Sequence, residues 1–396
     1  MKVYIITTEP FPNGMAATTR IKCYAKALMS VNIACEVIIT RRTERYGTKP
    51  RNVEGINLNS DVPFFYIGRT PLRASNVISR KYYDLYDERK LISFISNEMN
   101  TEDVIITYMR EHTLVEKILK YAHLKGIKVV RDLCEYPFPN VKKYNNVEKL
   151  RKAYFDKVFP KFNGIICISE ALLNVALRFK GENAKLLKLP IMINEKNYDY
   201  SLVEKKEEEH PYLFHGGTLY QQKDGILDVL EAFGKAKKSI PFPVKYLFTG
   251  SVDKSPESIE IKKIIREYNL NDSVEFLGYL SDDSLKSYIK GAKGFIINKL
   301  DNLQNKHCFA TKLAEYLLSG NPVITTNVGE AKYYLENSKS AILIESGNVE
   351  LLTEKIIDLF MSEYNCDIGE NGKKVAISNF SAEKQGDSLK SFLSSL

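Results

Sequence analysis

Two stretches in the second half of the chain combine residue types that bind phosphate. The first reads His215-Gly-Gly-Thr-Leu-Tyr-Gln-Gln-Lys223-Asp-Gly225, between an apolar run and a helical pattern. Gly216 and Gly217 would let backbone N–H groups approach an anion. Lys223 adds a positive charge near the start of a helix, whose N-terminus also favours phosphate. The stretch predicts an anion site; the alternative is a glycine turn beside a solvated lysine.

The second stretch runs from His307 to Glu330 and is typical of a loop, a short helix, a Gly-Asn-Pro break and a buried strand. Thr311 is expected to cap the helix. The donors expected to face the same ligand as Lys223 are the backbone N–H groups of Phe309, Ala310, Thr311 and Lys312. Glu315 lies about one turn into the helix, where a carboxylate can accept hydrogen bonds from sugar hydroxyls; the alternative is an acid favoured by the helix dipole.

Short apolar runs alternate with amphipathic segments along the whole chain, as in parallel sheets that are buried on both faces. In the first half the predicted strands are Val3–Thr7, Cys35–Thr40, Pro63–Gly68, Val104–Tyr108, Lys128–Arg131, Gly164–Ile168 and Ala184–Leu189. In the second half they are Tyr212–His215, Val244–Gly250, Val274–Leu277, Gly294–Asn298, Val323–Thr326 and Ala341–Ile344. This alternation predicts an α/β fold with two doubly wound, Rossmann-like domains.

The predicted domains are residues 1–192 and 211–378, joined by a linker at 193–210 that is rich in both acids and bases. A C-terminal helix at 379–396 is expected to pack back toward the N-terminal domain. Ligands in doubly wound folds bind beyond the carboxyl ends of the strands. We therefore expect the site in a cleft between the two domains.

Several classes of protein lose support from this sequence. It contains no GxGxxG, no GxxxxGK[ST], no GxSxG, no HExxH and no Asp-x-Asp. With 44% hydrophobic and 27% charged residues, the composition is that of a globular protein. Glu9 and Pro10 interrupt the first apolar run, which favours a first strand of an unprocessed cytoplasmic protein over a signal peptide.

The charge is unevenly distributed. Residues 1–190 have a balance of +13 and residues 191–396 a balance of −5. A basic first half favours an anionic partner, namely a phosphorylated substrate, a membrane surface or nucleic acid, although a solvated basic surface is an equally good explanation. Nucleic acid is the weakest of these, because the basic residues are not interleaved with aromatic ones in a recognisable module.

Taken together, the two stretches resemble the C-terminal domain of retaining GT-B glycosyltransferases of the group 1 (family 4) clan. Members typically show G-R-L-x-x-x-K-G, which appears here as Gly217-Thr218-Leu219 and, after three residues, Lys223-Asp224-Gly225. They also show E-x7-E before G-x-P-V-I, which appears here as His307-x7-Glu315 before Gly320-Asn-Pro322-Val-Ile. Thr218 and His307 depart from this pattern, because the family usually has a phosphate-binding arginine and a glutamate there. The strand ends at Gly250 and Gly278, the first loop at Gly14 and the last helix are also similar to the family, so the resemblance spans the chain.

The resemblance implies a metal-independent, hexosyltransferase-like enzyme and assigns roles to residues. The diphosphate of a UDP- or GDP-linked sugar would be bound by Lys223 and the glycine loop, and Glu315 would bind the ribose. The further donor contacts it implies are Gly14, Gly216, Gly217, Thr218, Gly278, Tyr279, Leu280, Phe309, Ala310, Thr311 and Lys312, with His307 in the catalytic set. Positive charge and backbone amides can stabilise a leaving diphosphate without a metal. No metal site and no cofactor other than the nucleotide-sugar substrate is expected.

On the N-terminal side, the segment from Arg131 to Phe138 follows a strand and is expected to open onto the cleft. In the clan a polar residue here often contacts the donor sugar, so Arg131 and Glu135 are candidates; the alternative is an ordinary strand-end turn. Lys142–Lys143 and Arg151–Lys152 follow, and they are candidates for a basic surface that contacts a lipid-linked acceptor or an anionic leaflet.

The sequence thus favours a retaining glycosyltransferase that moves a sugar from a nucleotide-activated donor to a glycan or lipid-linked saccharide, in surface polysaccharide or glycoconjugate synthesis. It would be cytoplasmic or peripheral at the inner membrane face, and would not bind nucleic acid. Two alternatives remain open. One is a nucleotide-sugar epimerase of the GT-B fold, and the other is a non-catalytic partner subunit of the same fold.

Overall fold

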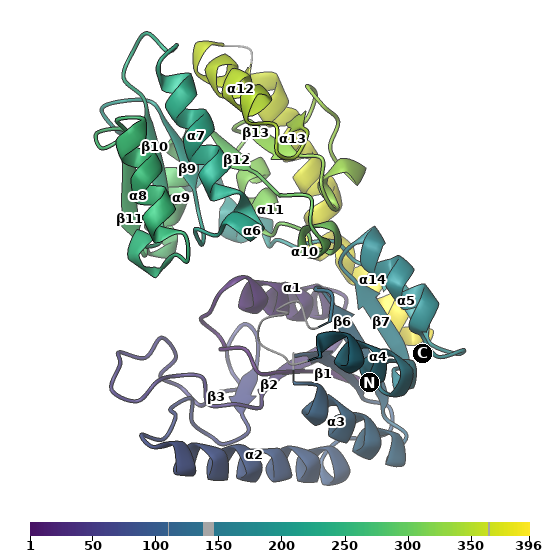
Figure 1. The fold of residues 1–396 in the computed structure, drawn as a ribbon. Helices are drawn as coiled ribbons and strands as arrows, with labels where there is room; N and C mark the ends of the chain where they lie inside the picture. Colours follow the sequence, from purple (N-terminus) through teal and green to yellow (C-terminus); the bar gives the residue numbers. More distant parts are fainter. Residues whose placement is uncertain (110, 138–145, 363–364) are drawn as a thin grey trace. The chain divides into compact units, whose positions relative to one another are not determined.

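The computed structural model describes residues 1–109, 111–137, 146–362 and 365–396 (Figure 1). The chain forms two compact units. Unit 1 contains Met1–Ile193 and Ala382–Leu396, and unit 2 contains Asn194–Ser381. Each unit is an α/β structure around its own sheet, as the alternation of apolar and amphipathic segments predicts.

In the described residues, unit 1 has an eight-stranded sheet in the order β3-β4-β2-β1-β5-β6-β7-β8. Its strands are β1 (Lys2–Thr7), β2 (Ala34–Ile39), β3 (Ile56–Asn57), β4 (Phe64–Tyr66), β5 (Val104–Tyr108), β6 (Lys128–Leu133), β7 (Gly164–Cys167) and β8 (Lys185–Lys188). Its helices are α1 (Ala16–Ser30), α2 (Val77–Asn97), α3 (His112–Leu124), α4 (Val147–Lys157), α5 (Glu170–Phe179) and α14 (Ala382–Ser394). The ladders are parallel except for the pairing of β3 with β4.

The core of unit 1 follows directly from the helical periodicity of α1. Ile21, Tyr24, Ala25 and Leu28 recur at helical spacing, and all four are fully buried against the sheet. A buried ion pair fixes the helix further. The Arg20 guanidinium lies 3.0 Å from Asp132 Oδ2 on β6 and donates to the carbonyl of Pro190 at 2.8 Å. Helix α1 is therefore joined to the centre of the sheet and to the chain just before it enters unit 2.

Unit 2 has, in its described part, a six-stranded parallel sheet in the order β11-β10-β9-β12-β13-β14. Its strands are β9 (Tyr212–His215), β10 (Lys245–Thr249), β11 (Val274–Gly278), β12 (Gly294–Ile297), β13 (Val323–Thr326) and β14 (Ile342–Ile344). Its helices are α6 (Gln221–Asp224), α7 (Ile226–Lys237), α8 (Ser258–Glu267), α9 (Asp282–Gly291), α10 (Leu303–His307), α11 (Lys312–Leu318), α12 (Val349–Met361) and α13 (Asn365–Phe380). Crossovers connect the consecutive strands that are not neighbours in the sheet. The strand order changes direction at β9, and this position is the topological switch point of the sheet. The carboxyl ends of β9 and β12 both lie there.

The residues between the two sheets are more ordered than a linker pattern implies. Short 3₁₀ helices occupy Glu195–Tyr198 and Tyr200–Leu202, and Tyr200 is buried. The hydroxyl of Tyr200 donates to the carbonyl of Glu315 at 3.3 Å, which attaches this segment to unit 2. The chain returns to unit 1 at Ala382, whose N–H donates to the carbonyl of Ile193 at 2.9 Å.

The C-terminal helix α14 belongs to unit 1. Leu389, Phe392 and Leu393 are buried in the same core as α1. Gly164 at the start of β7 leaves the space that Phe392 needs, because a Cβ there would lie 2.7 Å from the ring. The last helix therefore completes the unit that the first 193 residues build.

The predicted strands agree with the structure to within two residues at each end, but two long helices of unit 1 are missing from the sequence prediction. These are α2 and α4. Helix α2 lacks a simple amphipathic pattern because apolar residues occur on more than one of its faces. No helix in the described part of the chain combines the length and the apolar content that crossing a membrane requires.

Candidate active site

The glycine loop after β9 makes its backbone hydrogen bonds within the protein. The N–H of Gly216 donates to the Tyr316 hydroxyl at 2.7 Å, and the N–H of Gly217 donates to Thr249 Oγ1 at 2.7 Å. The two amides that the sequence assigns to an anion are therefore already occupied. Gly217 is needed for another reason, since its φ of +134° is a conformation that residues with a side chain rarely adopt.

A cluster of buried charged groups lies next to this loop. Asp224 lies at the end of α6. Its Oδ1 forms an ion pair with Lys299 Nζ at 2.8 Å and another with Lys312 Nζ at 3.2 Å. The Lys312 ammonium also lies 3.4 Å from His215 Nε2, and a Cβ on Gly217 would be only 3.6 Å from it. Three parts of the sequence thus converge here: the segment from the end of β9 to α6, the second residue after β12 and the start of α11.

Burial determines the protonation states of this cluster. It lowers the pKa of His215 to about 3, helped by the nearby Lys312, so the ring is neutral at physiological pH. Burial also lowers the pKa of Lys312 to about 8, against the attraction of Asp224. The two ammonium groups overcome the burial of Asp224 and hold its pKa well below the usual range. The carboxylate remains charged, while Lys312 titrates close to neutrality.

The two lysines differ in access to solvent. The side chain of Lys299 is 9% exposed and that of Lys312 is 16% exposed. Lys299 also donates to the carbonyl of Lys223 at 3.0 Å, which fixes the backbone of α6. Lys312 is therefore the cation that an incoming anion can meet, and Lys299 and Asp224 hold it in place.

The side chains that the sequence predicts to bind the anion directly do not belong to this buried cluster. Lys223 and Thr218 are exposed, and neither joins the buried cluster through its side chain. The sequence identified Lys312 only as a backbone donor and did not identify Lys299 or Asp224 as site residues. A signal for Lys299 was present, because this charged residue directly follows the predicted strand Gly294–Asn298, at the edge where ligands of doubly wound sheets bind.

The loop before α11 is fixed by packing. Phe309 is buried, stacks on Tyr334 with ring centroids 5.5 Å apart and meets Phe380 edge-on at the same distance. Thr311 occupies the N-cap position of α11, as predicted, but its side chain makes no capping hydrogen bond. His307 Nδ1 lies 2.8 Å from the carbonyl of Leu303 in its own helix, α10. Ala310 lies between these points, where its carbonyl accepts from the N–H of Leu313 at 3.0 Å.

Glu315 is half-buried on α11, one turn after Lys312. Its Oε1 accepts a hydrogen bond from the Tyr198 hydroxyl at 2.9 Å. Burial raises the pKa of Glu315, and the Tyr198 bond and the charge of Lys312 oppose that rise. Leu313, Leu317 and Leu318 are buried as the helical pattern predicts, so Glu315 lies off the core-facing side of the helix.

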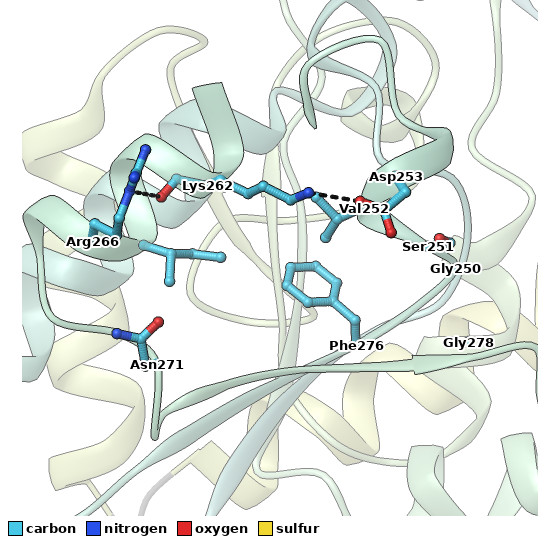
Figure 2. A pocket seen from close by; sticks show the side chains of 10 residues that line it. Gly250, Ser251, Val252, Asp253, Lys262, Arg266, Asn271, Phe276 and Gly278 are labelled. Atoms are coloured by element: carbon cyan, nitrogen blue, oxygen red, sulfur yellow. Dashed lines mark hydrogen bonds and ion pairs between the residues drawn. The ribbon is translucent and has the colours of Figure 1, made fainter. Parts of the chain in front are cut away.

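An open groove of about 680 Å³ lies beside β11 and α8 (Figure 2). Gly278, one of the predicted donor contacts, lines it together with Gly250, and the N–H of Gly250 donates to the carbonyl of Gly278 at 2.8 Å. Figure 2 shows Lys262 reaching toward Asp253, to which it is ion-paired at 2.7 Å, over the ring of Phe276. The next two predicted contacts differ in exposure: Tyr279 is 73% exposed and Leu280 is half-buried.

The candidates of unit 1 lie on two elements. Gly14 precedes α1, and a Cβ there would lie 2.0 Å from Thr18 Oγ1, so close packing requires the glycine. Arg131 lies within β6, is 8% exposed, and donates from Nη1 to the carbonyl of Met109 at 2.7 Å. Glu135 is half-buried beyond the end of that strand. Arg131 is therefore held inside the unit by its neighbours rather than standing in an open turn.

The predicted basic surface of unit 1 is wrong for Arg151. This residue is 6% exposed, pairs with Glu148 at 2.5 Å and donates to the carbonyl of Pro137 at 3.1 Å. Lys152 is exposed but paired with Asp156 at 2.7 Å. Phe138 and Lys142–Lys143 lie outside the described residues. Within the described part of the chain, no group of three or more His, Cys, Asp or Glu side chains is placed to hold a metal ion.

Comparison with known proteins defines the class. Residues 199–375 match the family described as glycosyl transferases group 1. Over this segment, the match confirms the resemblance found in the motifs. With their two doubly wound parallel sheets, the units have the GT-B fold class.

Particular proteins are similar over different lengths. A curated relative is an uncharacterized glycosyltransferase of Methanocaldococcus jannaschii, 26% identical over 230 residues; the alignment spans 56% of each chain, little more than half of that relative's length. Sucrose-phosphate synthase of Thermosynechococcus elongatus has a similar structure, with a TM-score of 0.73 at 13% identity over 100% of both chains. The pneumococcal O-GlcNAc transferase in complex with UDP and GlcNAc has a TM-score of 0.69 at 13% identity, covering 100% of this chain and 98% of that one.

Proposed function

We propose that this protein is a retaining glycosyltransferase that transfers a hexose from a nucleoside diphosphate sugar to a saccharide or lipid-linked acceptor. The observation that carries the proposal is the buried cluster of Lys312, Lys299 and Asp224 beside the glycine loop of a group 1 glycosyltransferase segment. Solved structures that are similar to this chain are complexes with UDP and glucose or with UDP and GlcNAc. UDP and GDP sugars are both candidates for the donor.

The cluster suits a leaving diphosphate because it carries a net positive charge in a partly dry environment. Two ammonium groups and one carboxylate leave one positive charge, and low dielectric strengthens its attraction for an anion. When the bond between the sugar C1 and the diphosphate oxygen breaks, the electron pair moves to that oxygen. Lys312 then stabilises the developing charge without reorganising, since Asp224 and Lys299 already fix its position.

The acceptor hydroxyl would attack from the face that the diphosphate leaves, and its proton would pass to the departing diphosphate. This route needs no pair of catalytic carboxylates. We propose that the reaction also needs no metal and no cofactor beyond the nucleotide sugar, because protein cations supply the charge. The reaction would take place on the cytoplasmic side of the membrane, in the synthesis of a polysaccharide or glycoconjugate.

In this proposal Glu315 accepts hydrogen bonds from the ribose of the bound nucleotide. Its Oε1 already accepts from Tyr198, which orients the carboxylate. Charged hydrogen bonds are worth about 1.5–3 kcal/mol each, so Glu315→Gln should weaken binding of UDP or GDP by at least about tenfold. Calorimetry on the wild type and the variant tests this, and Tyr198→Phe should produce a smaller loss. Unchanged affinity in Glu315→Gln would leave Glu315 a purely structural residue.

Turnover separates the proposed transferase from its two alternatives. Release of nucleoside diphosphate should be measured with a panel of UDP and GDP sugars, with and without saccharide acceptors. A transferase releases the diphosphate faster when the right acceptor is present. An epimerase converts the sugar without any acceptor, and a non-catalytic subunit does neither. Either of the last two results would overturn the proposal.

A further inference from the structure

The N-terminal half of helix α2 turns large apolar side chains outward. Ile78 is 83% exposed, Tyr82 63%, Leu85 57% and Tyr86 43%. Their spacing of i, i+4, i+7 and i+8 places all four on one face of the helix. We call these four residues the outer stripe. A surface helix normally turns such a face to the core, and a contiguous exposed apolar face marks an interaction site.

The outer stripe is not what attaches α2 to unit 1. Leu91 and Ile95 are fully buried on the other side of the helix. Phe94 packs edge-on against Tyr4 and Phe65, with ring centroids 5.6 and 5.5 Å away. In Figure 1 the helix runs along one side of its unit, next to α3. The helix is therefore anchored through its inner side, and the outer stripe remains available for a partner.

The acidic and basic side chains of α2 also lie on different sides of the helix. Asp87 is 1% exposed and paired with Arg42 at 3.1 Å, and Glu88 is paired with Lys117 of α3. Asp84, the third acid, is half-buried, and burial raises its pKa while the nearby Arg41 opposes that rise. The acids of the helix are thus turned toward the protein.

The cations of α2 lie on its exposed side. Lys81 and Arg89 are exposed, and within the described residues neither is ion-paired. Lys90 lies with its ammonium 4.6 Å from the centre of the Tyr86 ring, at the border of the outer stripe. The exposed face therefore combines apolar and aromatic side chains with positive charge alone.

We propose that the outer stripe of α2 docks unit 1 on an anionic lipid bilayer. Ile78 and Leu85 would enter the boundary between headgroups and acyl chains, Tyr82 and Tyr86 would lie at headgroup level, and Lys81 and Arg89 would face lipid phosphates. The charge complementarity extends beyond the helix, because residues 1–190 have a balance of +13. A second copy of the chain fits less well, since it would bring like charges together.

This docking is independent of the transfer reaction and is tested on the full chain. Wild-type protein is sedimented with vesicles of phosphatidylcholine alone and with vesicles that also contain phosphatidylglycerol. We expect binding to the anionic vesicles and a marked loss of binding when salt is raised, because the electrostatic part is screened. Binding to neither type of vesicle would overturn the proposal.

Two double variants then locate the contact. Ile78→Ser with Leu85→Ser should reduce vesicle affinity by at least about tenfold, because each change removes an apolar side chain that would enter the bilayer. Lys81→Glu with Arg89→Glu should reduce it more steeply, since each cation near an anionic surface contributes about fivefold and its reversal adds repulsion. Circular dichroism and thermal unfolding check that both variants remain folded.

Helix α8 of unit 2 offers the matched control. It carries Ile259, which is 78% exposed, and Lys263, which is exposed one turn later. Ile259→Ser with Lys263→Glu should leave vesicle binding unchanged. Equal losses in the control and in the α2 variants would overturn the proposal. So would a wild-type dimer in sedimentation velocity that Ile78→Ser with Leu85→Ser dissociates while vesicle binding persists.

Discussion

At the scale of single residues, burial gives Lys312 the properties of a diphosphate contact. Lys223 was the expected cation from the motif, yet it is exposed, whereas Lys312 is held by Asp224 beside Gly217. A fixed cation in a low dielectric stabilises an anion more than a solvated one does.

This difference predicts unequal effects of two substitutions. Lys312→Met should reduce affinity for UDP on the order of 10- to 100-fold, because it removes a charged hydrogen bond worth about 1.5–3 kcal/mol. Lys223→Ala, for which the motif alone predicts a severe loss, should have the smaller effect. Calorimetry on both variants measures the contrast, with Lys152→Met on the exposed surface of unit 1 as the control. A larger loss in Lys223→Ala would restore the assignment made from the motif.

The pKa of Lys312 predicts a pH dependence near neutrality. A lysine with a pKa of about 8 loses its charge well below the ordinary value of 10.5. Affinity for UDP should therefore fall as the pH rises through about 8, by as much as tenfold for each further unit. The lowered pKa of Lys312 also affects the free energy of unfolding, which should rise with pH over the range in which UDP affinity falls. The unfolded chain holds this proton more tightly, so the cost of the buried ammonium is present below about pH 8 and declines toward pH 10.5. UDP affinity that is flat between pH 7 and 9 in wild type would contradict the assignment.

At the scale of elements, the pair Arg20–Asp132 joins α1 to β6 and, through the carbonyl of Pro190, to the end of unit 1. Both side chains are at most 3% exposed, and Tyr24 donates a further hydrogen bond to Asp132 at 3.0 Å. Removing one partner would leave the other charge buried and unpaired.

We therefore predict that Asp132→Asn destabilises unit 1 by about 3–5 kcal/mol. Arg20→Met with Asp132→Leu should cost less than the single change, because neither charge is left alone. The exposed pair Lys152–Asp156 is the control, and Lys152→Met should change stability by no more than about 1 kcal/mol. Urea unfolding followed by tyrosine fluorescence measures all three. Equal effects of the buried and exposed pairs would contradict the prediction.

At the scale of the whole molecule, we expect lysine side chains to supply the positive charge that a metal ion would otherwise supply. Lys299 and Lys312 leave one net positive charge after Asp224 is counted, and this charge lies in unit 2, whose segment matches the glycosyltransferase family.

Transfer activity should therefore survive a chelator. The assay compares sugar transfer in excess EDTA with transfer in added magnesium or manganese, and rates are expected to agree within about twofold, because positioned ammonium groups replace the metal. Lys312→Met provides the complementary test, since in this variant added magnesium should not restore the rate. Activity that EDTA abolishes and a divalent cation restores would contradict this prediction.

The two sheets and the family resemblance could be predicted from the sequence. Runs such as Gly164–Cys167 and Gly294–Ile297 contain only apolar residues and glycine, which is the composition expected of strands buried on both faces of a sheet. The glycine loop and the Glu315 helix were also readable, since local spacing determines turns and helix faces.

The members of the charged cluster could not be identified without the tertiary structure. Asp224, Lys299 and Lys312 are 75 and 13 residues apart along the chain, and crossovers around the switch point of the sheet bring both ammonium groups within 3.2 Å of the Asp224 carboxylate. The sequence likewise could not show that Tyr316 and Thr249 occupy the amides of Gly216 and Gly217, or that Arg151 is buried. Ion pairing, burial and hydrogen-bond partners depend on distances between remote segments, and no local pattern encodes these distances.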